Sequence, residues 1–130
     1  MLLITQPPAI QTAQFTISLN FGAGTTTVAT ATGDLIIDAI TLYCSVAGAG
    51  LTSLAIQTNQ TTNYVVLNST DGAVANLTAG KVIATTWTQA QPFFLLSGQL
   101  IQRTIAGTGT NGTIIMSVRY RGVTTTGSLA

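Results

Sequence analysis

The clearest alternation of hydrophobic and polar residues lies near the end of the chain, in residues 113–121. Four apolar side chains form one row there: Ile114, Met116, Val118 and Tyr120. Because successive side chains of a strand point to opposite faces, this pattern predicts a half-buried strand. Asn111-Gly112 stands directly before it and is typical of a type I′ turn. The sequence therefore predicts a closing hairpin in which residues 99–110 pair with residues 113–121.

Similar patterns predict further strands at residues 13–21, 25–32, 35–46, 51–58, 64–69, 81–88 and 93–96. Residues 35–46 are apolar on both parities, as expected of a central strand that is covered on two faces. Gly48-Ala49-Gly50 predicts a break before residues 51–58. Residues 73–80 fit either a single helical turn or a loop.

Seven to nine short strands with glycine-containing turns indicate an all-β fold, an antiparallel sandwich or barrel. With about eight strands, a jelly-roll-like arrangement is the first expectation. An immunoglobulin-like sandwich is the alternative, although the chain lacks paired cysteines. We expect an extended N-terminal arm over residues 1–12, where Pro7-Pro8 lacks two amide donors. A single β domain over 13–123 and a flexible C-terminal tail over 124–130 complete the expected organisation.

Charged residues make up 5% of the chain, against about 25% in an average soluble domain. The net charge is +1, so a free monomer would have little electrostatic repulsion and would tend to associate. This composition predicts a surface covered by copies of the chain or by a partner. Four basic residues are too few for nucleic-acid binding. We expect no membrane span and no exported precursor, because no long apolar run and no signal-peptide pattern occur.

Candidate catalytic residues are scarce, because the chain has no His and no Glu. Asp34 and Asp38 would lie about 13 Å apart along one strand, beyond the roughly 9.5 Å of glycosidase pairs. Residues 107–112 match G-x-G-x-x-G, but a strand pattern follows them where a dinucleotide site needs a helix. The single Cys44 is expected to pack as a small hydrophobe. We expect no enzymatic activity, no catalytic residue, no cofactor and no metal site.

Asp38 stands out because it shares the parity of apolar residues, where an unpaired carboxylate would be costly. An ion pair with Arg103, Arg119 or Arg121 is the expected explanation. Trp87 and the tyrosines could instead form a sugar-binding surface, so a glycan-binding β-sandwich is an alternative function. A self-polymerising surface or filament subunit is another.

Taken together, four features resemble the small all-β decoration, or cement, proteins of tailed-phage capsids. They are the apolar arm Met1–Gln11, short Thr-, Gly- and Ala-rich strands, few charges, and the closing strand of residues 113–120. The resemblance implies a jelly-roll or related fold, often trimeric, that sits on the outer capsid surface of the virion and stabilises the shell. It implies the major capsid protein and copies of the chain itself, as a homotrimer, as partners. For the glycan-binding alternative, it implies a module of a phage fibre or tail.

Under this hypothesis, contacts come from the apolar arm and from the few basic residues that would fix the register of binding. The expected partner-binding residues are Leu2, Leu3, Ile4, Arg103, Arg119 and Arg121.

Overall fold

The computed structural model of the protein describes residues 9–86, 92–123 and 127–130. Within these residues the chain forms eight strands and one short 3-10 helix, η1. They are β1 (Gln11–Ser18), β2 (Gly24–Thr32), β3 (Leu35–Thr58), β4 (Val65–Leu67), η1 (Val74–Asn76), β5 (Lys81–Ile83), β6 (Phe93–Leu95), β7 (Leu100–Gly122) and β8 (Ser128–Leu129). The prediction of an all-β antiparallel fold of about eight strands is confirmed. None of the described segments forms a helix long and apolar enough to cross a membrane.

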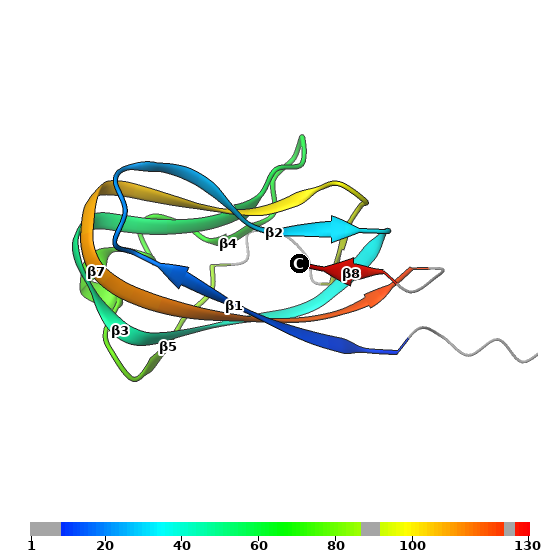
Figure 1. Cartoon of the computed structure of the whole chain (residues 1–130), viewed down its shortest axis with the longest axis horizontal. Helices are drawn as coiled ribbons and strands as arrows, with labels where there is room; N and C mark the ends of the chain where they lie inside the picture. Colours follow the sequence, from blue (N-terminus) through cyan, green and yellow to red (C-terminus); the bar gives the residue numbers. More distant parts are fainter. Residues whose placement is uncertain (1–8, 87–91, 124–126) are drawn as a thin grey trace, which may run out of the picture.

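Two long strands, β3 and β7, organise the fold. They pair antiparallel from Leu35 and Gly122 at one end to Thr58 and Ile101 at the other. Both strands bend near their middle, so that each runs through both layers of an open, jelly-roll-like sandwich (Figure 1). β1 extends the layer that contains the second half of β7, and β2 extends the layer that contains its first half. The strands β1 and β2 therefore lie at the same side of the sandwich, one in each layer.

The predicted hairpin at Asn111-Gly112 is wrong, because β7 continues through these residues. The two segments that were expected to pair with each other both pair with β3 instead. Gly112 has a φ of 131°, and a Cβ there would lie 2.9 Å from the Cα of Gly48 in the bend of β3. Glycine is required here because two bent backbones pack closely. The predicted strand break at Gly48-Ala49-Gly50 is likewise wrong, since β3 runs through it as the matching bend.

The alternation in the second half of β7 is confirmed, because its apolar row lies in the core. In β3, however, the buried parity changes from Leu35 and Ile37 to Ile40 and Leu42. The register with β7 shifts between Ile37 and Ala39, as in a β-bulge. Because of this bulge, the core-facing positions change from odd-numbered to even-numbered residues within 35–46, and apolar residues occur at both. The expectation of a strand covered on two faces is therefore wrong.

Several shorter segments differ from their predicted bounds. The strand expected at 81–88 ends at Ile83, and Trp87 lies outside the described residues. The helical-turn alternative for residues 73–80 is confirmed by η1. Residues 128–129 of the expected tail form β8, whose Leu129 pairs with Ala31 of β2 and is buried.

One hydrophobic core lies between the two layers and draws on every strand. Phe93 of β6 is its largest fully buried side chain. The ring of Tyr64 stacks on Phe93 with centroids 4.4 Å apart. This core fixes which side chains of each strand remain outside and so defines the surfaces described next.

Candidate interaction surfaces

An ion pair joins Asp38 of β3 to Arg121 of β7 on the outer face of one layer. The Oδ2 atom of Asp38 lies 3.3 Å from Nε of Arg121, with 18% and 38% of the two side chains exposed. The bulge after Ile37 turns Asp38 outward, away from the core. The predicted ion pair is thus confirmed, with Arg121 as the partner. Asp38 shares its face with Ile36, as predicted, but not with Ile40 and Leu42, which lie in the core.

Exposed apolar side chains lie on the same outer face. Ile36 pairs with Arg121 on one side and with Phe94 of β6 on the other. Phe94 is 56% exposed, and Leu96 beside it is also exposed. Farther along β3, Tyr43 pairs with Val82, and both of these are exposed as well. The outer face of this layer, which we call the outer apolar face, is defined by Ile36, Tyr43, Val82, Phe94 and Leu96.

Of the remaining predicted contact residues, the structure describes Arg103 and Arg119, and these two lie in different environments. Arg119 of β7 is exposed. Leu2, Leu3 and Ile4 lie outside the described residues. Arg103, in contrast, is 6% exposed and points inward with the first half of β7. The structure therefore separates Arg103 from Arg119 and Arg121, which lie on the outside.

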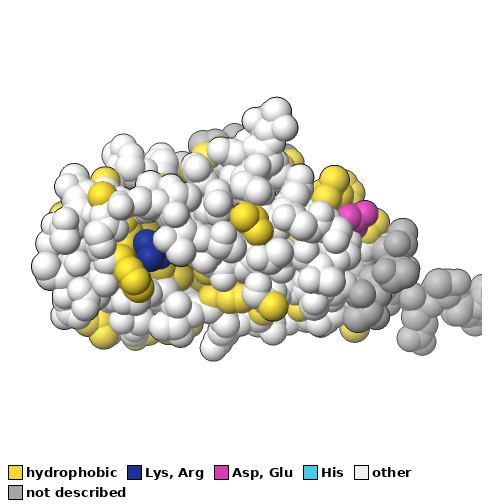
Figure 2. Space-filling view, turned by 45° about the horizontal axis from the view of Figure 1, so that its top comes forward, with side chains coloured by type: hydrophobic (Ala, Val, Ile, Leu, Met, Phe, Trp, Pro, Cys, Tyr) yellow, Lys and Arg dark blue, Asp and Glu magenta, His cyan; other side chains and the backbone are white. Residues whose placement is uncertain are grey.

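The buried guanidinium of Arg103 lies under an exposed aromatic ring. Its Cζ atom is 4.9 Å from the centroid of Phe21, which stands in the connection between β1 and β2. Burial lowers the pKa of Arg103 from its usual value. A cation held over the face of a ring is attracted by the ring quadrupole. Figure 2 shows one face of the molecule, mostly uncharged, on which a single basic side chain lies among hydrophobic atoms.

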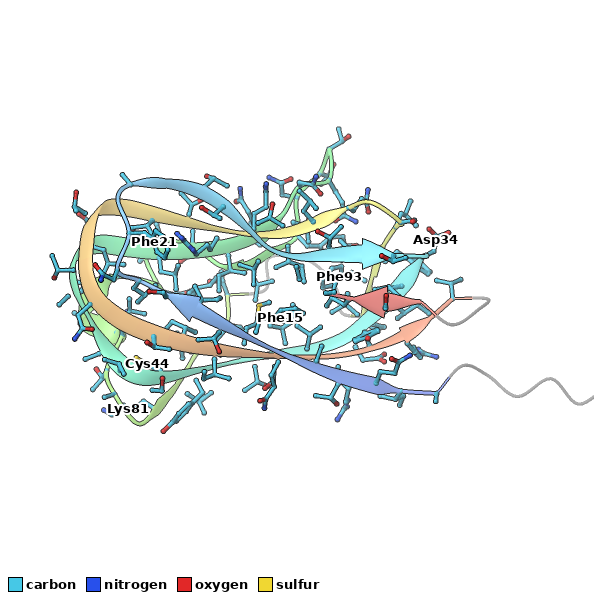
Figure 3. All side chains as sticks on the ribbon, in the orientation of Figure 1. Phe15, Phe21, Asp34, Cys44, Lys81 and Phe93 are labelled. Carbon is cyan, nitrogen blue, oxygen red and sulfur yellow. The ribbon has the colours of Figure 1, made fainter. Side chains whose placement is uncertain are left out.

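Arg103 forms part of a groove between the two edge strands β1 and β2. The groove has a volume of about 490 Å³. It is lined by residues 14–18 of β1, Phe21, residues 26–28 of β2 and Arg103. In Figure 3, Phe21 lies near the end where β1 connects to β2, and Phe15 lies farther along β1. We call this the β1–β2 groove.

Sequence reasoning missed this groove, although one signal for it was present. Arg103 alternates with Ile101 and Ile105, both fully buried, in the same way as the apolar row of residues 114–120. Because alternate side chains of a strand share a face, this alternation places Arg103 on the same, core-facing side as Ile101 and Ile105. Phe21 was expected to end a strand, and no local pattern indicates that it covers an arginine far along the chain.

The other candidate groups have structural roles. Oδ1 of Asp34 accepts a hydrogen bond from the amide of Ser97 at 2.9 Å. Oδ2 of Asp71 accepts one from the hydroxyl of Thr86 at 2.7 Å. The buried thiol of Cys44 donates to the carbonyl of Val46 at 3.2 Å, and burial raises its pKa. Among the described residues, no group of His, Cys, Asp or Glu side chains could hold a metal ion.

A second cavity, of about 340 Å³, lies beside η1 and β5. Asp71 and Lys81 both line it, but the carboxylate of Asp71 is already bonded to Thr86. No nucleophile with an adjacent base lines this cavity in the described part of the chain. The glycines of residues 107–112 were expected at a hairpin tip but lie within β7, and the chain continues after them as a strand and not as a helix.

No family model matches this chain, and no curated protein matches it. Solved structures with a similar fold include a chain of the cyanophage Pam1 capsid asymmetric unit, with a TM-score of 0.55 and 11% identity. That match covers 94% of this chain and 91% of the other. A chain of the acid-stable capsid of Helicobacter pylori bacteriophage KHP30 matches with a TM-score of 0.51 and 12% identity, over 94% and 98% of the two chains.

The IMPa metallopeptidase of Pseudomonas aeruginosa also matches, with a TM-score of 0.39 and 19% identity. This match covers 89% of the present chain but 13% of the metallopeptidase. Its TM-score is too low to carry an argument. The two capsid chains, in contrast, share the fold of this chain over nearly their whole length.

Proposed function

We propose that the protein is a structural virion protein, and specifically a decoration or cement protein that binds the outer surface of a phage capsid shell and stabilises it. The observation that carries the proposal is the fold that this chain shares with two phage capsid chains over nine-tenths of each. Because both matches span almost the whole of the other chain, the capsid chains are of similar length. A small, separate β subunit fits an accessory role on a shell.

The surface chemistry supports the same proposal. The outer apolar face has few charges, and its Asp38 and Arg121 neutralise each other. Burying such a face against another protein avoids the cost of desolvating unpaired ions, and the cores of protein interfaces are depleted in charge. In the proposed assembly this face packs on the major capsid protein, and copies of the chain associate as a homotrimer. Arg119 and Arg121 fix the register, and Leu2, Leu3 and Ile4 reach a neighbouring subunit.

A pair of matched phenylalanine variants tests which face binds. Phe94→Ser changes the outer apolar face, whereas Phe21→Ser changes a ring of similar exposure in the β1–β2 groove. Each purified protein is mixed with capsid shells that lack it and is sedimented with them. We expect the wild type and Phe21→Ser to sediment with the shells and Phe94→Ser to remain in solution. A wild-type protein that never sediments with shells would overturn the proposed function.

Deletion of residues 1–8 tests the arm. We expect the far-ultraviolet circular dichroism spectrum to stay unchanged, because all eight strands lie outside this segment. We expect the mass from light scattering to fall from trimer to monomer, or shell binding to weaken. Unfolding of the truncated protein would show instead that the arm belongs to the fold of its own subunit.

The glycan-binding alternative has little support from the three tyrosines, and Trp87 lies outside the described residues. Tyr64 stacks on the core, and Tyr120 is buried with its hydroxyl 3.2 Å from Oε1 of Gln11. Tyr43 is exposed, but its neighbours Val82 and Ile115 are aliphatic. Stacking on a sugar ring needs a free aromatic face, and these tyrosines provide one such face and no cluster.

A further inference from the structure

Arg103 is a charge on the inner side of the sandwich, and the chain holds no acid to balance it. The sequence has three acidic residues, Asp34, Asp38 and Asp71, and no others. Asp38 pairs with Arg121, and the other two accept hydrogen bonds from Ser97 and Thr86. A counter-ion for Arg103 must therefore come from another molecule.

The guanidinium is also without a hydrogen-bond acceptor among the described residues, and it contacts the ring of Phe21. A fully dry, unpaired guanidinium would be very costly. Oδ2 of Asp38 is the one atom of the described side chains that is buried without a hydrogen-bond partner, so the nitrogens of Arg103 keep contact with solvent. Because Arg103 lines the β1–β2 groove, that contact is through the groove. The side chain of Arg103 is thus 94% buried, and its remaining exposed surface faces the β1–β2 groove.

Both walls of the groove are strands with an unpaired edge. In the described part of the chain, β1 pairs with β7 alone. β2 pairs with β7 on one side, and on the other side β8 covers Ala31 and Thr32 but leaves residues 24–29 free. An open strand edge offers a row of backbone donors and acceptors to an added strand. β8, which pairs with the end of β2, shows that a short extended segment can add to this edge of β2 (Figure 1).

A hydroxyl group next to Arg103 adds a further donor. Thr26 pairs with Arg103 across the β2–β7 ladder, so its side chain points to the same face. A carboxylate accepts several hydrogen bonds and pairs with a guanidinium in two parallel bonds, whereas an amide of the same shape does not carry the charge. The volume of about 490 Å³ lies in the range of about 300–1,000 Å³ that ligand pockets have.

We propose that the β1–β2 groove binds an extended acidic segment of a partner protein, which adds as a strand to the free edge of β1 or β2 and places an Asp or Glu carboxylate on Arg103. Main-chain hydrogen bonds of this kind provide affinity, and the side-chain pocket provides selectivity. The proposal does not depend on the virion role, because it rests on the charge balance of the chain and on its open strand edges.

The test is a nuclear magnetic resonance titration of the ¹⁵N-labelled full chain with two capped pentapeptides, Thr-Val-Glu-Val-Thr and Thr-Val-Gln-Val-Thr. We expect the Glu peptide to shift the Nε–H signal of Arg103 and the amides of residues 14–18 and 24–28. We expect its Kd to be at least about tenfold lower than that of the Gln peptide. Arg103→Met should remove this difference, while Arg119→Met, at an exposed arginine of the same strand, should retain it.

Three outcomes would overturn the proposal. The first is equal affinity of the wild type for the two peptides, which needs no variant and stands even if Arg103→Met does not fold. The second is a set of shifts outside the β1–β2 groove, or no saturable shifts at millimolar peptide. The third is inorganic phosphate producing the same shifts as the Glu peptide with equal affinity, since the groove would then be a site for simple anions and not for a strand.

Discussion

The two halves of β7 carry the same kind of alternation and use their arginines in opposite ways. In the second half, Arg121 lies outside and pairs with Asp38 of the neighbouring strand. In the first half, Arg103 lies inside between Ile101 and Ile105 and faces no acid of the chain. The ion pair between Asp38 and Arg121 neutralises both charges within the chain. The inward charge of Arg103 has no counter-ion in the chain, so we expect its counter-ion to come from another molecule. The position of a charge relative to the core, and not its presence alone, decides which of these roles it has.

The largest effect is expected at the bend that separates the two halves. The amide of Gly109 donates to the carbonyl of Phe21 at 2.8 Å, and a Cβ at this position would overlap the carbonyl oxygen of Leu19. Gly109→Ala should therefore force the two backbones apart and lower the free energy of unfolding by about 3 kcal/mol. Urea denaturation measures this loss. Gly22→Ala is the control, because a Cβ at Gly22 meets nothing within 4 Å; an equal loss in both variants would contradict the close approach.

Arg103→Met should stabilise the isolated protein. The substitution replaces a buried charge that has no acidic partner by an apolar side chain of similar length, and so removes the desolvation cost of that charge. The lost contact with Phe21 offsets part of this, so we expect a net gain of about 1 to 2 kcal/mol in denaturant unfolding. A gain in stability with a loss of peptide selectivity is the signature of a residue kept for binding. A loss of stability would indicate instead that the guanidinium supports the fold.

Arg121→Met should have a smaller effect of the opposite sign. It leaves the mostly covered carboxylate of Asp38 without its partner. Since the pair is partly exposed, we expect a loss of about 1 kcal/mol in the free energy of unfolding. Arg119→Met, at an exposed arginine on the same strand, is the control and should change stability little. Equal values for the two variants would mean that the ion pair adds nothing to stability.

Phe21→Ala should have the smallest effect, because the ring is 53% exposed and its main contact is Arg103. We expect a loss of about 0.5 kcal/mol from the cation–π contact. The same substitution in the Arg103→Met background should cost less, and the difference is the coupling between the two side chains. A double-mutant cycle in thermal unfolding measures it, and zero coupling would contradict the contact.

The sequence predicted the strands well and their partners poorly. Apolar alternation is a local property, so the row of residues 114–120 was found where the structure has it, and the first strand, predicted at 13–21, overlaps β1 but begins and ends earlier. The pairing of strands, in contrast, depends on residues far apart in the sequence. Asn111-Gly112 favours a tight turn in isolation, but the segments on both sides of it form longer ladders with β3, and these ladders override the turn preference.

The candidate sites show the same limit. The ion pair of Asp38 followed from the cost of an unpaired carboxylate, which holds in any fold, but its position was missed because counting by two fails across the bulge at Ile37 and Ala39. The inward direction of Arg103 could be read from its neighbours Ile101 and Ile105. The groove itself could not be predicted from the sequence, because it forms only where β1 and β2 lie at the same side of two different layers.

The continuous pairing of β3 with β7 also bears on how the chain acquires its structure. Leu35 meets Gly122, and Thr58 meets Ile101, so the central ladder joins segments that are far apart in the sequence. Loop-closure entropy must be overcome before such contacts form, and folds of this kind fold in about milliseconds to seconds. On the ribosome, β3 would emerge long before β7, and although β4, β5 and β6 could pair with one of its edges, the edge that pairs with β7 would stay open until β7 had been synthesised. The order of synthesis thus makes β3 the segment most exposed to aggregation during folding.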